Sequence, residues 1–247
     1  MIIDYHRPST ISECLGLLSR KEPKTVPLAG GTFLSRHQDE DLAIVDLQDL
    51  GLDKILLSDT SAQIGAMVML NNLEENPRLS HLFRAVIRQE SNYNQRHRAS
   101  IAGTLVCADG YSSIACAFMA INAQLRWQPD NKIITLEDYY IRRCRGSDGI
   151  GLLMSDILIP EMGELYYEDV GRSPMDRPLI CVAVARWADG GKRICFGGDF
   201  QSPVVIPDAF NREEVKNIVR DAYSHYSKHQ NYHIETTLTL IDRLGSN

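Results

Sequence analysis

Apolar and polar residues change their spacing several times along the chain, and each change predicts a different element. Residues 9–19 open with a serine and a threonine, after which apolar side chains recur every three or four positions, the spacing of a capped helix. Two apolar runs, at 26–28 and 43–47, are short enough to be buried strands. Because a glycine loop separates these strands, the order predicts a small α/β unit over about residues 1–54.

The stretch after this unit mixes strand and helix spacing, which predicts a sheet with helices packed on it. The predicted elements are antiparallel strands at 55–57 and 63–67 joined by a turn at 58–61, a largely helical region over 72–87, an alanine-rich helix at 114–121, a hairpin of 124–127 with 132–136, and a strand at 157–160. Proline ends the last strand because it supplies no N–H to a ladder, so we place a domain boundary near Glu161.

The remainder of the chain predicts a second unit of strands followed by helices. Residues 181–187 and 192–196 alternate around a glycine-containing turn, which is typical of a hairpin in a sheet covered on one face. The tail over 212–244 has the apolar spacing of two helices. We expect an α+β fold with domains at 1–161, divided into subdomains of about 1–54 and 55–161, and at 162–247.

Composition and charge narrow the class of protein. Hydrophobic residues make up 44% of the 247 residues and charged residues 23%, which are ordinary globular values. A formal net charge of -6 disfavours a nucleic-acid partner, and the one basic cluster, at 96–98, suits a local anion better than a duplex. The first residues lack the pattern of a signal peptide, and no apolar run approaches the ~20 residues of a membrane span. We therefore expect a cytoplasmic protein that binds neither nucleic acid nor membrane.

Cysteine and histidine spacing gives no metal motif. No C-x-x-C pair occurs among the six cysteines, so we expect them to be reduced and mostly buried: Cys14, Cys107, Cys116, Cys144, Cys181 and Cys195. His225, His229 and His233 recur every four residues and would form a stripe on one helix. The stripe is typical of a solvated or interface face, and a zinc site there would need further ligands.

Two adjacent glycines give the first candidate site. Leu28-Ala29-Gly30-Gly31-Thr32-Phe33-Leu34 places the glycines directly after an apolar run. Without Cβ atoms the backbone can turn its N–H groups inward to hold phosphate oxygens. The same residues are also typical of an ordinary tight turn.

A second candidate loop lies at residues 94–104. It combines small residues, hydroxyls and the charges of Arg96 and Arg98, which together suit an anion. The alternative is that both arginines are solvated surface charges and that residues 100–103 are a close-packed strand end.

These loops, together with Ile64-Gly65-Ala66-Met67 and the closing Ile157-Leu158-Ile159-Pro160, resemble the FAD-binding subunit of the molybdenum hydroxylases, the family of xanthine dehydrogenase and the medium subunit of carbon monoxide dehydrogenase. The resemblance runs nearly end to end. It implies an FAD-binding domain of the PCMH type over 1–161, made of a small α/β subdomain and a mixed or antiparallel sheet with helices. It also implies a C-terminal domain, like that of carbon monoxide dehydrogenase flavoproteins, with a three-stranded antiparallel sheet and helices.

The resemblance further implies a function. FAD would pass electrons from iron–sulfur clusters to an acceptor such as NAD, and the partners would be a large subunit that binds the molybdenum cofactor and a small 2Fe-2S subunit. No side chain of this chain would act as a catalytic acid or base or as a metal ligand. The residues implied to bind FAD are Leu28, Ala29, Gly30, Gly31, Thr32, Phe33, Leu34, Ser100, Ile101, Gly103, Thr104, Asp109, Tyr111, Ser113 and Leu153.

Four positions depart from the family pattern. Phe33 and Ser113 stand where the family commonly has aspartate, Ala102 replaces a glycine, and Thr104 replaces an asparagine. Asp109 is near enough in sequence to replace the carboxylate missing at Ser113. These departures motivate two alternatives: a structural or assembly subunit of the same fold without FAD, and a flavoprotein-like chain with a different nucleotide in the same cleft.

Overall fold

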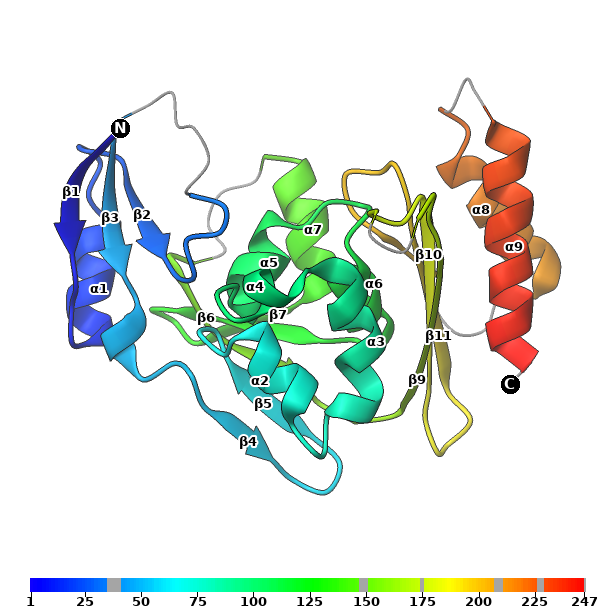
Figure 1. Ribbon diagram of the computed structural model, residues 1–247, viewed down its shortest axis with the longest axis horizontal. Coiled ribbons are helices and arrows are strands. Elements are labelled where there is room, and N and C mark those ends of the chain that lie inside the picture. Colours follow the sequence, from blue (N-terminus) through cyan, green and yellow to red (C-terminus); the bar gives the residue numbers. More distant parts are fainter. Residues whose placement is uncertain (35–40, 147–150, 174–175, 207–210, 226–228, 247) are drawn as a thin grey trace.

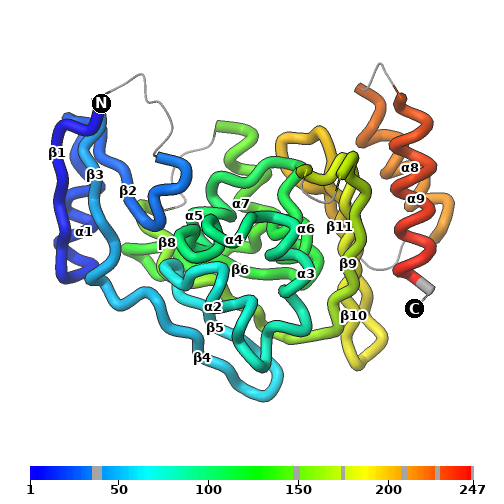
Figure 2. The backbone as a smooth tube through the Cα atoms, in the orientation of Figure 1, coloured from blue at the N-terminus to red at the C-terminus, as the bar shows by residue number. Residues whose placement is uncertain are grey.

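The computed structural model describes residues 1–34, 41–146, 151–173, 176–206, 211–225 and 229–246. Within these ranges the chain forms three sheets that follow one another from the N-terminus to the C-terminus (Figure 1). The tube view separates the N-terminal sheet at one end from the C-terminal helix pair at the other (Figure 2). The architecture is mixed α+β, as the sequence predicts.

The N-terminal sheet is parallel, with the order β1-β3-β2. Its elements are β1 (Ile2–His6), α1 (Ile11–Leu18), β2 (Thr25–Leu28), β3 (Leu42–Asp46) and the short 3-10 helix η1 (Gln48–Leu50). Thr10 caps α1 by accepting a hydrogen bond from the N–H of Glu13 at 3.2 Å, and α1 packs on β3 through Val45. The predicted helix and both strands are confirmed.

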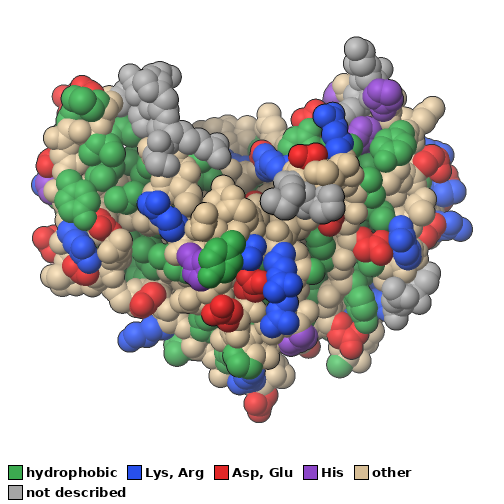
Figure 3. Space-filling view, in the orientation of Figure 1, with side chains coloured by type: hydrophobic (Ala, Val, Ile, Leu, Met, Phe, Trp, Pro, Cys, Tyr) green, Lys and Arg blue, Asp and Glu red, His purple; other side chains and the backbone are tan. Residues whose placement is uncertain are grey.

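Strand β1 has no counterpart among the predicted elements. Its apolar side chains do not alternate with buried positions, because Ile2, Ile3 and Tyr5 are 51%, 48% and 51% exposed on the edge of the sheet. Hydrophobic side chains are visible on the surface over this end of the molecule (Figure 3).

The middle sheet is antiparallel, with the order β4-β5-β8-β6-β7. Its strands are β4 (Ile55–Leu57), β5 (Ala62–Gly65), β6 (Gln124–Gln128), β7 (Lys132–Thr135) and β8 (Leu153–Ile159). The helices of this part are α2 (Leu70–Glu75), α3 (Ser80–Glu90), α4 (Tyr93–Arg96), α5 (Ile101–Cys107), α6 (Ser113–Ala120) and α7 (Leu136–Cys144). Every residue of α6 is buried, so this helix lies at the centre of the largest core.

The C-terminal sheet has the order β12-β11-β10-β9 and is followed by two helices. Its elements are β9 (Glu164–Val170), β10 (Ile180–Arg186), β11 (Lys192–Gly197), β12 (Val204–Ile206), α8 (Arg212–Ala222) and α9 (Gln230–Ser246). The resemblance implied three strands here, and the sheet has four; the residue pattern located β10 and β11 but neither β9 nor β12. Three residues beside a proline are too short to give an alternating pattern.

Strand β10 is buried on both faces, so the expectation of a sheet covered on one face is wrong. Cys181, Ala183 and Ala185 belong to the core around α6, whereas the alternate, larger side chains at 180, 182 and 184 belong to the core formed with α8 and α9. Figure 1 shows β10 between α6 and this helix pair. Small residues on the first face let the alanine-rich α6 approach closely. In the sequence, an alternation of small with branched side chains resembles an alternation of buried with exposed positions, although residues 180–185 are all buried.

Three further expectations change. Residues 101–107 form helix α5 rather than a strand end, because Ser100 caps them. Helix α7 was not predicted, since its cap, Thr135, lies inside the run read as a strand. The histidine stripe is wrong: His225 follows the end of α8, and His229 has a φ of 59° before α9 begins, so the three histidines do not share a helix. Four of the six cysteines are buried, as expected, but Cys107 and Cys144 are exposed.

The stacked pair Phe83 and Phe118 tests the central core. Their ring centroids lie 4.7 Å apart, and both side chains are 0% exposed. We expect Phe118→Ala to lower the free energy of unfolding by about 3–5 kcal/mol, because a cavity remains beside Phe83. Ile133→Ala, at a half-exposed position on β7, is the control and should change it by no more than ~0.5 kcal/mol. Equal losses in urea denaturation would contradict the proposed centre of the core.

Candidate functional site

The first glycine loop follows β2 and touches the backbone of the second loop. A Cβ on Gly30 would lie 1.6 Å from the carbonyl oxygen of Arg98, so only glycine fits this contact. Gly31 has a φ of +69°, in the left-handed region that favours glycine. Glycine is therefore required at the two positions for different reasons: Gly30 permits the close approach of the backbones, and Gly31 permits the turn.

The first loop presents unused donors. Within the described ranges, no hydrogen bond uses the backbone N–H of Gly30, Gly31 or Thr32. Backbone N–H groups brought together in a turn form a concave site for an anion. Of the two interpretations of this loop, the geometry favours the anion cradle.

The second loop uses its N–H groups internally. The N–H groups of Ile101 and Ala102 donate to the carbonyl oxygens of residues 68 and 66 at 2.9 and 3.2 Å, and that of Gly103 donates to Ser100 Oγ at 3.1 Å. The hydroxyl of Ser100 accepts this bond and keeps its own proton to donate. This loop thus offers a hydroxyl donor, whereas the first offers backbone donors.

Both loops line a groove with two connected halves. The apolar half has a volume of ≈ 400 Å³ and the polar half ≈ 540 Å³. Four residues line both halves and mark the passage between them: Thr32, Phe33, Gly103 and Cys107. The apolar half is also lined by Leu47, Met67, Val106, Trp127, Leu153 and Met154. An elongated ligand with a flat apolar end suits this shape.

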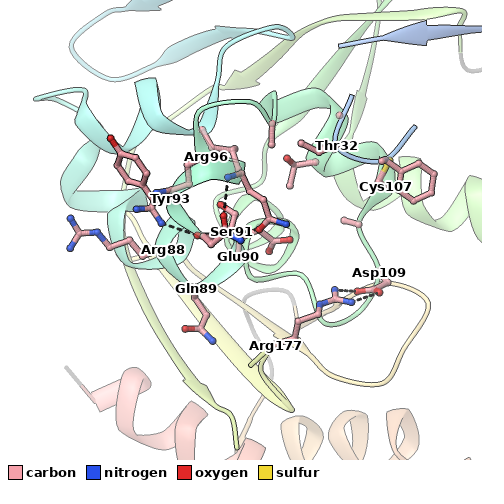
Figure 4. A pocket seen from close by; sticks show the side chains of 18 residues that line it. Thr32, Arg88, Gln89, Glu90, Ser91, Tyr93, Arg96, Cys107, Asp109 and Arg177 are labelled. Atoms are coloured by element: carbon pink, nitrogen blue, oxygen red, sulfur yellow. Dashed lines mark hydrogen bonds and ion pairs between the residues drawn. The ribbon is translucent and has the colours of Figure 1, made fainter. Parts of the chain in front are cut away.

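The arginines of the polar half are each paired with a carboxylate, and Figure 4 shows the pair of Arg177 with Asp109. Buried Glu74 holds Arg88 Nε at 2.6 Å and Arg96 Nε at 2.7 Å, while Asp109 holds Arg177. The sequence suggested that Arg96 supplies positive charge to an anion. Instead its guanidinium braces the loop, because it also donates to the carbonyl oxygen of Ser91 at 2.8 Å.

Glu90, at the end of α3, is one of two carboxylates among the described residues that line the polar half. Its Oε2 accepts hydrogen bonds from Ser112 Oγ at 2.9 Å and from the N–H of Ile114 at 3.1 Å, at the start of α6. Burial raises the pKa of Glu90, although these two hydrogen bonds and nearby Arg177 oppose the rise. The folded protein therefore holds this proton more tightly than a free glutamate does.

Most of the residues predicted from the sequence lie along the groove. Those that line it are Ala29, Gly30, Gly31, Thr32, Phe33, Leu34, Ser100, Gly103, Thr104, Asp109 and Leu153. Leu28 and Ile101 do not line it, and Ile101 is fully buried in the central core. Tyr111 lines a smaller neighbouring pocket of ≈ 280 Å³. Ser113 is buried and accepts a hydrogen bond from the hydroxyl of Tyr167 at 2.7 Å.

The departures from the family pattern have distinct surroundings. Phe33 is 48% exposed at the passage between the halves, where its ring presents apolar surface. The hydroxyl of Thr104 donates to the carbonyl oxygen of Ser100 at 2.9 Å, so it has only lone pairs to offer a ligand. Ala102 lines the apolar half with 8% of its surface exposed.

Several lining residues were not foreseen. Arg88 and Glu90 lie on α3, and Arg177 comes from the C-terminal domain, so no local motif connects them with the loops. Cys107 was treated only as one of six buried cysteines. No sequence signal distinguishes Arg88 and Glu90, because charged residues are common at the end of a helix.

A glycine loop with unused backbone donors, set in a groove with an apolar and a polar half, suits an elongated ligand with an anionic centre. The family described as "FAD binding domain in molybdopterin dehydrogenase" matches residues 1–162. The chain belongs to this family, whose cofactor is FAD and whose members are components of oxidoreductases. The resemblance inferred from the motifs is thereby confirmed.

Two curated relatives support the assignment. The medium chain of carbon monoxide dehydrogenase from Afipia carboxidovorans is 29% identical over 203 residues, which are 76% of this chain and 70% of that one. The uncharacterised protein YgfM of Escherichia coli K12 is 25% identical over 202 residues, 80% of this chain and 75% of that one.

Solved structures share the fold. Quinoline 2-oxidoreductase from Pseudomonas putida 86 has a TM-score of 0.77 at 16% identity, covering 98% of this chain and 95% of that one. Carbon monoxide dehydrogenase from Hydrogenophaga pseudoflava has a TM-score of 0.76 at 20% identity, covering 98% and 96%. The likeness extends through both expected domains and confirms the α+β fold class. No helix among the described residues has the length and apolar character needed to cross a membrane.

The contact at Gly30 gives a test of the cradle. We expect Gly30→Ala to lower the free energy of unfolding by about 1–3 kcal/mol, because its Cβ must push the Arg98 carbonyl away. Gly16→Ala is the control, since nothing lies within 4 Å of its Cβ and alanine favours helix α1 by roughly 1 kcal/mol. Urea denaturation measures both, and a neutral Gly30→Ala would contradict the contact.

The raised pKa of Glu90 predicts a pH-dependent stability. An unfolded glutamate ionises near pH 4, but burial keeps Glu90 protonated to a higher pH in the folded protein. Above about pH 4 the stability of the unmodified chain therefore falls, whereas Glu90→Gln has no such group to ionise. We expect the free energy of unfolding of Glu90→Gln, relative to the unmodified chain, to increase as pH rises from about 4 to about 8. A difference that stays constant across this range would count against burial as the cause.

Proposed function

We propose that this chain is the FAD-carrying subunit of a molybdenum hydroxylase complex. Partner chains would bind the molybdenum cofactor and the 2Fe-2S clusters, and electrons would leave through FAD to an acceptor such as NAD. The observation that carries the proposal is the set of unpaired N–H groups at Gly30, Gly31 and Thr32, beside the Ser100 hydroxyl, in a groove with two distinct halves.

These residues fit the diphosphate of FAD. Three backbone donors and one hydroxyl match an anion with several oxygen acceptors, and no side chain at Gly30 obstructs the cradle. The diphosphate would lie at the passage between the halves, and each half would take one ring system. Leu153, Met154 and Met67 would contact the ring in the apolar half.

The chain's own contribution is to bind and orient. FAD supplies the electron transfer when bound, so no side chain of this chain needs to act as an acid or base. Each arginine that lines the polar half is already paired with a carboxylate, so no described side-chain cation there competes with the backbone N–H groups for the diphosphate. Backbone dipoles would therefore position the phosphates, and the shape of each half would position its ring.

The relatives support a multi-chain complex. The curated relative from Afipia carboxidovorans is the medium chain of a carbon monoxide dehydrogenase, a name that implies larger and smaller companions. The same arrangement would place the iron–sulfur clusters and the molybdenum cofactor on other chains here. We propose a cytoplasmic location for the complex.

Titration of the purified chain with FAD tests the proposal. We expect saturable binding with the visible absorption bands of protein-bound flavin, and a higher melting temperature. Ser100→Ala should raise the Kd for FAD about 10- to 150-fold, because it removes a hydrogen bond to a charged group.

The Ser100 substitution needs a matched control, because it also removes the cap of α5. Thr135→Ala removes the cap of α7, outside the groove, and should cost similar stability with an unchanged Kd. A chain that stays colourless with excess FAD and shows no thermal shift would instead support the structural subunit. Binding of another nucleotide in place of FAD would support the second alternative.

A further inference from the structure

The connection between α5 and α6, residues 108–112, forms one rim of the polar half of the groove. Ala108 and Asp109 line that half directly. The connection is too short to form an element of its own, so its position depends on what holds it. Most of its partners come from the C-terminal domain.

Backbone contacts attach this connection to the turn after β11. The N–H of Gly110 donates to the carbonyl oxygen of Phe200 at 2.9 Å, and the N–H of Gly198 donates to that of Gly110 at 2.8 Å. A Cβ on Gly110 would lie 2.5 Å from the Phe200 oxygen, so the two segments approach as closely as backbones can. These two bonds fix the middle of the connection to the turn after β11.

Arg143 on α7 reinforces the same junction. Its guanidinium donates to the carbonyl oxygen of Ala108 at 2.7 Å and to that of Gln201 at 3.2 Å, one on each side of the domain boundary. The ring of Tyr140 lies 4.6 Å from this guanidinium. The base of the connection is therefore held by several bonds that no ligand needs to disturb.

One ion pair links the Asp109 side chain of this rim to the part of the chain beyond residue 162, and the N–H of Tyr111 also donates to Asp109 Oδ1 at 3.0 Å. Arg177 donates to both carboxylate oxygens of Asp109, at 3.0 and 2.5 Å (Figure 4). Arg177 also lies over the ring of Tyr111, 5.4 Å from its centroid. Among the described residues that line the polar half, Arg177 is the one beyond residue 162. The side chains of Arg177 and Asp109 are 60% and 46% exposed, so water and salt reach the pair.

We propose that Arg177 is a positioning residue that holds the Asp109 rim against the groove, so that the C-terminal domain sets how fast bound FAD leaves. A bidentate pair fixes the direction of the carboxylate as well as its distance. Both oxygens of Asp109 accept hydrogen bonds from Arg177, and a carboxylate repels a diphosphate, so in this proposal Asp109 acts by closing the groove and not by binding FAD. The inference rests on the proposed function, since it requires FAD in the groove.

We call the Arg177–Asp109 pair the clasp. The rate of FAD release tests it, and this rate can be followed by the recovery of free-flavin fluorescence after dilution. We expect Arg177→Met and Asp109→Asn each to speed release about two- to fivefold, the range that an exposed ion pair gives. The double variant should release FAD no faster than either single variant, because both remove the same interaction. Salt should speed release from the unmodified chain but not from Arg177→Met.

A matched control comes from another exposed pair. Arg212 and Asp242 lie 2.5 Å apart with side chains 75% and 49% exposed, away from the groove. Arg212→Met should leave the release rate unchanged. Arg177→Lys keeps the charge but not the bidentate geometry, so we expect a release rate between those of the unmodified chain and Arg177→Met. If Arg177→Met folds poorly, Arg177→Lys provides the test in its place.

The outcomes separate the clasp from its alternatives. Release rates equal to that of the unmodified chain, or rate increases that multiply in the double variant, would overturn the clasp while leaving FAD binding intact. Slower release from Asp109→Asn would also overturn it, because a freed Arg177 would then be binding FAD directly. Failure of the unmodified chain to bind FAD at all would instead refute the proposed function.

Discussion

The approach of the Gly30 backbone to the carbonyl oxygen of Arg98 is the contact on which the site depends. It joins the loop after β2 to the connection between α4 and α5, which are separated by nearly seventy residues of chain. If any side chain stood at Gly30, the loops would have to part, and Gly31, Thr32 and Ser100 would no longer line one groove as they do here. The groove therefore depends on the contact between these two loops, and neither loop forms it alone.

The balance of charge in the groove follows a consistent pattern. Arg88 and Arg96 share one buried carboxylate, and Arg177 pairs with another. The cations of the polar half therefore stabilise the protein through ion pairs of their own. In the proposed complex, the negative charge of the diphosphate is met by oriented backbone N–H groups. Such donors are fixed by the fold and need no rearrangement when the ligand arrives.

Local patterns predicted much of the fold and the centre of the site. Glycine pairs, capped helices and alternating strands are encoded by neighbouring residues, so the first loop, α1, α6 and the β10–β11 hairpin followed from the sequence. The partners of Asp109 and Arg96 could not be foreseen, because Arg177 and Glu74 are distant in sequence and their pairing depends on tertiary packing. For the same reason, Ser113 was assigned to the cofactor although it is buried beneath β9. A motif specifies a loop, whereas the role of each charge in it is decided by what packs against it.

The burial of β10 on both faces has a consequence for local motion. A strand covered on one side by α6 and on the other by α8 and α9 can lose its backbone hydrogen bonds only when much of the molecule unfolds. Its amides should be among the slowest to exchange with solvent, although β10 supplies none of the described groove-lining residues. Release of the rim, as proposed, would therefore leave the most protected part of the chain intact.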